Sequence, residues 1–133
     1  MRVSVLCALL LLAVAAVARA QSQAEINAQA CAGSAAADRE LNAVYQAVLR
    51  QNAGDKRFTA KFRAAQRAWV AFRDAEMAAR YPAEDIQMEY GTMYNYCYCT
   101  EVAALTRQRT EALRRWRDGI AEGDGCSGSY PVR

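Results

Sequence analysis

The chain has 133 residues, of which 17 are basic and 14 acidic, and it contains no histidine. Basic and acidic residues are interleaved without a long basic block, which argues against a nucleic-acid-binding protein. Without histidine the chain lacks the Ser–His and Cys–His pairs of common nucleophilic enzymes, and it has no glycine-rich phosphate loop. We therefore expect no catalytic residues, no cofactor and no metal site.

The N-terminal segment has the order of an export signal. Arg2 precedes an apolar run from Val3 to Val17, and Ala18-Arg19-Ala20 has the small-x-small pattern of a cleavage site. The run is shorter than the roughly 20 residues that a membrane-spanning helix needs. Residues 1–20 are therefore predicted to be a signal peptide, the alternative being an uncleaved N-terminal anchor. Cleavage would leave one domain with no further run long enough to span a membrane.

Three helices are predicted, in chain order. The first spans Ala24 to about Gln51, with a weak point at Gly33-Ser34 where it breaks or starts afresh. The second spans about Phe58 to Arg80 and ends before Pro82, because proline disfavours helical geometry in the residue that precedes it. The third begins at Thr92 or Asn95 and continues to Gly119.

Each predicted helix carries an apolar stripe at steps of three and four residues. The stripes consist, helix by helix, of Ala37, Leu41, Val44, Tyr45 and Val48, then Phe58, Phe62, Ala65, Trp69, Phe72 and Ala79, then Tyr98, Val102, Leu105, Ala112 and Trp116. Such helices, joined by short loops, predict an all-α fold: a small antiparallel bundle of three main helices over residues 21–126. Residues 127–133 are expected to form a flexible tail.

Four cysteines follow the predicted cleavage site: Cys31, Cys97, Cys99 and Cys126. An even number in a small exported domain predicts two disulfides that staple the bundle. The alternative, a zinc site, is disfavoured because there is no histidine and the spacing is Cys-x-Cys rather than Cys-x-x-Cys. In a bundle of this topology Cys31 lies at the same end as Cys97 and Cys99. Those two point about 200° apart on a helix, so only one of them faces Cys31.

Polar residues accompany the stripes of the second and third helices. In the second, Gln66, Arg73 and Asp74 surround Trp69 and Phe72, and in the third Thr106 and Arg109 belong to a similar polar set. Ion pairs and amide hydrogen bonds between the two sets would fix the register of helices whose apolar faces alone could slide. We interpret these residues as a packing motif, the alternative being a ligand site.

Four motifs in order resemble the lysozyme inhibitor LprI-like N-terminal domain family. They are Glu40-Leu41-Asn42-x-x-Tyr45, Gln66-Arg67-x-Trp69-x-x-Phe72-Arg73-Asp74, Gly91-Thr92-Met93, and Leu105-Thr106-Arg107-Gln108-Arg109-Thr110-x-x-Leu113. The resemblance implies an exported helical domain that inhibits lysozyme through protein–protein contact. It also favours Cys97 as the partner of Cys31, which leaves Cys99 for Cys126. A helix from 99 to 119 would be about 30 Å long, which is hard for the tail to span, so either the third helix is shorter than predicted or Cys126 stays unpaired. The chain has no lipobox cysteine and is expected to be soluble.

The segment between the second and third helices is rich in tyrosine. Tyr90, Tyr94 and Tyr96 are the candidate binding residues, because tyrosine gives a large contact area at low entropic cost. The alternative is that these rings pack around the disulfides. The expected partner is a protein, with lysozyme as the family's implied target. An envelope interaction module without lysozyme activity is the other hypothesis.

Export can be tested by the mass of the protein recovered from the periplasm. We expect cleavage after Ala20, because the basic start, apolar run and cleavage motif occur in the order that signal peptidase requires. Intact-mass spectrometry should then find a chain that begins at Gln21. A full-length chain in the membrane fraction would contradict the prediction.

Overall fold

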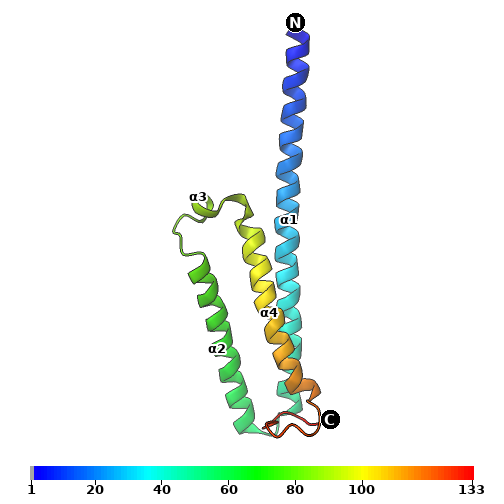
Figure 1. Ribbon diagram of the computed structural model, residues 1–133, viewed down its shortest axis with the longest axis vertical. Coiled ribbons are helices and arrows are strands. Elements are labelled where there is room, and N and C mark those ends of the chain that lie inside the picture. Colours follow the sequence, from blue (N-terminus) through cyan, green and yellow to red (C-terminus); the bar gives the residue numbers. More distant parts are fainter. Residues whose placement is uncertain (1) are drawn as a thin grey trace.

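The helices are α1 (Arg2–Gln51), α2 (Lys56–Arg80), the short α3 (Ile86–Tyr90), the 3-10 turn η1 (Gly91–Met93) and α4 (Tyr94–Asp118). The computed structural model describes residues 2–133, with side chains described from Ser22 onward. In Figure 1, α1 and α4 lie side by side and run in the same direction, and α2 runs in the opposite direction. The predicted all-α fold with three main helices is confirmed.

Helix α1 continues without a break through Gly33, where the sequence suggested a weak point. A single glycine inside a helix costs only about 1 kcal/mol relative to alanine, and the face of α1 that follows it is buried against α4. The predicted signal peptide lies outside the residues whose side chains are described, so its cleavage stays a prediction. Among the described residues, no helix is both long and apolar enough to cross a membrane.

Helices α1 and α4 form the closest contact in the molecule. The residues buried along it are mostly small or β-branched: Ala37, Leu41, Val44 and Val48 on α1, and Ala103, Thr106, Thr110 and Leu113 on α4. Small side chains allow two helix backbones to approach each other, since interaxial distance follows the side chains at the contact. The buried Thr110 hydroxyl donates a hydrogen bond to the Thr106 carbonyl oxygen at 2.9 Å, so this hydroxyl has a partner in the interior.

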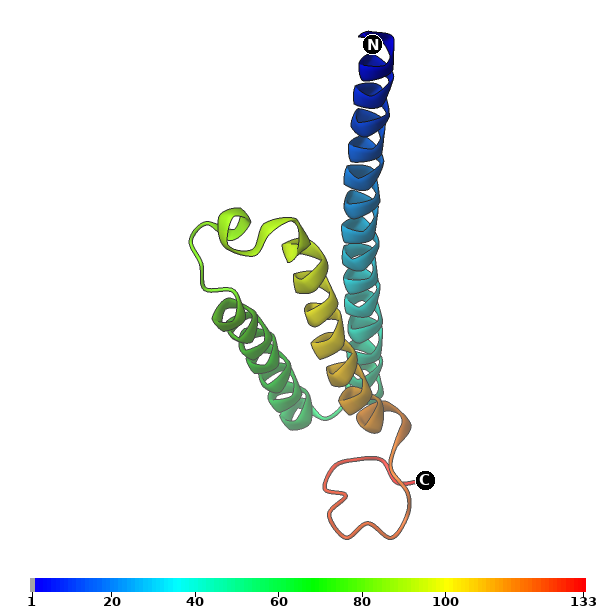
Figure 2. The same ribbon diagram turned by 45° about the horizontal axis from the view of Figure 1, so that its top comes forward.

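Helix α2 packs mainly through larger side chains and stands further from its neighbours (Figure 2). Phe62 is its central contact, with ring centroids 5.5 Å from Tyr45 and 5.9 Å from Trp116. Phe58 extends this aromatic cluster to both Phe62 and Trp116, each at 5.3 Å. Aromatic rings therefore fill the wider space between α2 and its neighbours.

The predicted stripe on α2 is wrong at three positions. Ala65, Phe72 and Ala79 are exposed, with Phe72 at 55%, whereas the buried residues are Thr59, Phe62, Gln66 and Met77. The buried face of α2 is rotated relative to the predicted stripe. It includes polar side chains, which a search for apolar residues does not find. On α4 the buried residues face α1, whereas the predicted stripe is half-buried except for Ala112, which is exposed.

The C-terminal segment folds back onto the end of α4. Ile120 N donates to the Pro131 oxygen at 2.8 Å, and the Tyr130 ring lies 4.1 Å from that of Trp116. Gly119 permits this return, because its φ is +86° and a Cβ there would lie 2.7 Å from the Pro131 oxygen. Residues 127–133, expected as a flexible tail, thus form hydrogen bonds with Ile120 and Glu122 just after α4, and an aromatic contact with Trp116 of the bundle.

One disulfide is present among the described residues, between Cys31 and Cys99, with a Cα–Cα distance of 4.8 Å. The predicted Cys31–Cys97 and Cys99–Cys126 pairs are wrong, and Cys97 and Cys126 are free thiols. Cys97 and Cys99 point in nearly opposite directions on α4, and it is Cys99 that faces α1. Cys126 follows the far end of α4, about 30 Å of helix from Cys99, which its short tail cannot span.

Peptide mapping without reduction should recover one linked pair, Cys31 with Cys99, and alkylated Cys97 and Cys126. Reduction is expected to lower the free energy of unfolding by about 4 kcal/mol, because the bond closes a long loop of 68 residues in sequence separation. Cys97→Ser serves as the control and should leave the urea midpoint unchanged. A peptide linking Cys97 or Cys126 to another cysteine would contradict the assignment.

Two aromatic residues on α2 should differ sharply in their contribution to stability. Trp69→Ala is expected to cost about 3 kcal/mol, because its indole is half-buried against the core. Phe72→Ala is expected to cost less than about 1 kcal/mol, since its ring is largely exposed. Urea denaturation followed by circular dichroism measures both. Equal losses would show that Phe72 is packed after all.

Candidate functional site

The link between α2 and α4, together with the first residues of α4, forms a structured segment over residues 81–98, which we call the tyrosine turn. Asp85 caps α3 by accepting a hydrogen bond from Met88 N at 2.9 Å. Gly91, with a φ of +63°, ends α3 and starts η1, a conformation that glycine adopts at little cost. These local signals redirect the chain from α2 into α4 at the end where α1 continues past the bundle (Figure 1).

Four tyrosines pack together at the base of the tyrosine turn. The Tyr81 ring contacts Tyr90 at 5.2 Å and Tyr94 at 5.1 Å, both edge-to-face, and Tyr98 at 6.1 Å. The Tyr90 hydroxyl also accepts a hydrogen bond from Ala83 N at 3.4 Å. Tyr90 and Tyr94, predicted to bind a partner, are thus half-buried and hold the turn in shape.

Burial, followed by the neighbouring phenols of Tyr98, Tyr81 and Tyr90, raises the pKa of Tyr94 above its usual range. Like any tyrosine hydroxyl at neutral pH, that of Tyr94 is protonated and can donate a hydrogen bond. Tyr96, the third predicted binding residue, lies apart from this cluster. It lines a groove of about 310 Å³ between α1 and α4 with Gln29, Thr100 and Arg107.

The tip of the tyrosine turn presents exposed groups that the sequence interpretation missed. Met88 is 84% exposed, and Gln87 and Glu89 on either side are exposed too. Glu84 and Asp85 add two more exposed carboxylates. The available signal was the charge pattern, because the chain has no lysine or arginine from Tyr81 to Thr106. The tip is therefore an apolar side chain in an acidic setting.

A hydrogen bond from α1 holds the tyrosine turn, and an ion pair joins the two helices on either side of it. Asn27 Nδ2 on α1 donates to the Thr92 oxygen at 3.0 Å, and the Cys31–Cys99 disulfide lies just below. On the other side Arg80 of α2 forms an ion pair with Glu101 of α4. The turn is anchored before any partner binds, which lowers the entropy lost on association.

The polar residues of the second and third helices meet as a packing motif further along the bundle. Arg109 Nε donates to Gln66 Oε1 at 3.0 Å across the α2–α4 contact, beside the fully buried Thr106. The guanidinium groups of Arg73 and Arg109 lie 5.3 and 5.9 Å from the centre of the Trp69 ring.

Arg73 connects two helices. Its side chain is 17% exposed, lies 3.0 Å from its neighbour Asp74 and reaches Asp38 on α1 at 3.6 Å. These contacts fix the register of α2 against α1. Among the described residues, no group of three or more histidine, cysteine or carboxylate side chains is placed to hold a metal ion.

A family model described as lysozyme inhibitor LprI matches residues 14–113. The chain belongs to the lysozyme inhibitor LprI family. The match covers α2, the tyrosine turn and most of α1 and α4, including every residue of the interhelical packing motif. Comparison with curated proteins gives no match, and comparison with solved structures gives none either.

Proposed function

We propose that this LprI-family protein is exported to the periplasm and inhibits a lysozyme by inserting the tip of the tyrosine turn into the enzyme's substrate cleft. The family supports the target, because its description is lysozyme inhibitor LprI. The observation that carries the proposal is the exposure of Met88 at the tip of a braced, protruding segment. A protruding turn can enter a cleft, whereas the side of a helical bundle cannot.

Charge supports the same surface. Many lysozymes are basic proteins, and they hold a catalytic acid and a second carboxylate in the cleft. The exposed carboxylates of Glu84, Asp85 and Glu89 lie in a stretch without basic residues and would steer the turn toward a basic enzyme. By contrast, Arg115 and Arg117 lie at the last turn of α4, away from the tyrosine turn. The positive net charge of the chain therefore does not prevent a basic enzyme from approaching the tyrosine turn.

The exposed groups at the tip can make two different kinds of contact with a cleft, apolar and hydrogen-bonding. Met88 offers a flexible apolar side chain for the hydrophobic walls of a sugar-binding cleft. The Gln87 amide is exposed and can donate hydrogen bonds to the cleft carboxylates. The tyrosine cluster acts beneath them as the support that keeps the tip in one conformation.

Replacement of the exposed tip tests this mechanism directly. Met88→Asp should lower inhibition of a basic lysozyme at least tenfold in a cell-wall clearing assay, because it removes the apolar anchor. Its stability should be unchanged, since the side chain makes little contact with the fold. Val132→Asp is the matched control, because Val132 is an exposed apolar residue on the C-terminal segment.

Charge and ring variants complete the experiment. Glu84→Gln with Glu89→Gln should slow association and weaken its salt dependence, whereas Glu122→Gln should not. Tyr90→Ser with Tyr94→Ser should also weaken inhibition, by loosening the support. Full inhibition by folded Met88→Asp would move the site elsewhere. No inhibition by the wild-type protein, against several lysozymes, would favour an envelope interaction module.

A further inference from the structure

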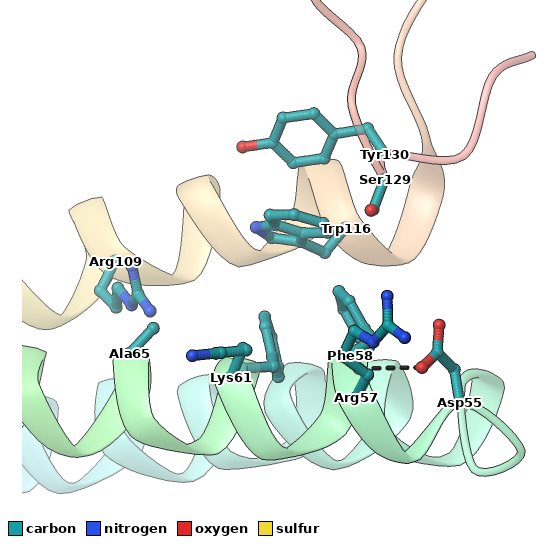
Figure 3. A pocket seen from close by; sticks show the side chains of 10 residues that line it. Asp55, Arg57, Phe58, Lys61, Ala65, Arg109, Trp116, Ser129 and Tyr130 are labelled. Carbon is teal, nitrogen blue, oxygen red and sulfur yellow. Dashed lines mark hydrogen bonds between the residues drawn. The ribbon is translucent and has the colours of Figure 1, made fainter.

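A second candidate site lies at the opposite end of α2 from the tyrosine turn. A cavity of about 700 Å³ opens between the first turns of α2, the last turns of α4 and the C-terminal segment (Figure 3). This volume falls in the range of small-molecule sites, about 300–1,000 Å³. Four aromatic residues line it: Phe58, Phe62, Trp116 and Tyr130.

The charged groups of this cavity are mostly cationic. Arg57, Lys61 and Arg109 line it, and Asp55 is its sole carboxylate. The Asp55 side chain already accepts the hydrogen bond from Phe58 N that caps α2, at 2.9 Å. In the part of the chain with described side chains, none of the three cations forms an ion pair. The cavity therefore has an excess of positive charge that the protein does not neutralise.

Arg109 is the most informative of these cations. It is half-buried, and among the described groups only its Nε has a hydrogen-bond partner, the Gln66 amide. Burial lowers the pKa of Arg109 below its usual range, which Tyr130 partly offsets, but a guanidinium remains charged at neutral pH. A partly desolvated cation beside an open cavity is a preferred partner for an anion, because such charge-assisted hydrogen bonds are strong.

The aromatic wall defines the rest of the ligand. Trp116 and Tyr130 lie together at 4.1 Å on the α4 side, and the Arg115 guanidinium lies 4.9 Å from the Tyr130 ring centre and helps to fix it. Figure 3 shows Lys61 and Arg109 at one end of the cavity and the aromatic wall toward the other. Aromatic rings beside cations suit a compact ring that carries a negative group at one edge.

We propose that this cavity binds an acidic sugar, with the carboxylate held by Lys61 and Arg109 and the sugar ring against Trp116 and Tyr130. A free inorganic anion would contact only the cations of the cavity, and a neutral sugar would contact only its aromatic wall. The site shares no residue with the tyrosine turn, so its ligand binds independently of lysozyme.

Three probes separate these contributions in calorimetric titrations of the purified protein. N-Acetylmuramic acid combines a sugar ring with a carboxylate, N-acetylglucosamine has the ring alone, and lactate has the carboxylate alone. We expect N-acetylmuramic acid to bind at least tenfold more tightly than either of the others. In NMR spectra, the indole N–H signal of Trp116 should shift on binding. That of Trp69, which does not line the cavity but lies beside Arg109, should shift less than that of Trp116.

Matched variants then locate the charge requirement. Lys61→Gln should weaken binding of N-acetylmuramic acid about tenfold, and because Lys61 is exposed the fold should persist. Arg63→Gln, an exposed position on the same helix outside the cavity, should bind like the wild type. Arg109→Lys should retain more binding than Arg109→Gln. Met88→Asp should also bind the sugar normally, which separates this site from the inhibitory one.

Three results would overturn the proposal. They are equal affinity for N-acetylmuramic acid and N-acetylglucosamine, equal affinity of Lys61→Gln and Arg63→Gln, and absence of binding by the wild-type protein. A shift of the Trp69 signal without that of Trp116 would likewise place the ligand elsewhere.

Discussion

The parallel packing of α1 against α4 is the constraint on which the rest of the structure depends. It is built from small and β-branched side chains and is covalently closed at one end by the Cys31–Cys99 disulfide. Close-packed helices resist sliding, because a shift would open gaps between their side chains. Register between the two helices is therefore fixed, and both the tyrosine turn and the C-terminal segment are positioned from this pair.

Helix α2 has a different relation to the pair. Its contacts are made by large aromatic side chains and by a few polar ones, among them Gln66 with Arg109 and Arg73 with Asp38. Because rings rather than backbone fill the interface, α2 stands away from α4 at both ends. The tyrosine cluster fills one end, whereas the other is left open as the cationic cavity.

The two ends of the bundle differ in charge as well as in shape. The tyrosine turn is acidic, while the start of α2 and the end of α4 carry the cations of the cavity. The small net charge of the whole chain conceals this separation. A basic enzyme and an acidic sugar would accordingly approach opposite ends, since each responds to the local field within about a Debye length rather than to the total charge.

The sequence by itself determined the helical class, the number of main helices and most of their ends. These follow from local properties: apolar periodicity, Pro82 after α2 and Gly119 after α4. It also indicated that Gln66 and Arg109 belong to one packing motif, because polar residues beside an aromatic stripe need partners.

Only the tertiary structure decided which faces are buried and which cysteines meet. Periodicity gives the spacing of a stripe, but its rotation depends on neighbours, so Phe72 is exposed while Gln66 is buried. Likewise, the choice of Cys99 over Cys97 rests on the rotation of α4 against α1. The exposure of Met88 and the cavity beside Arg109 also arise from segments far apart in the chain. Their arrangement is set by packing, which local sequence preferences do not encode.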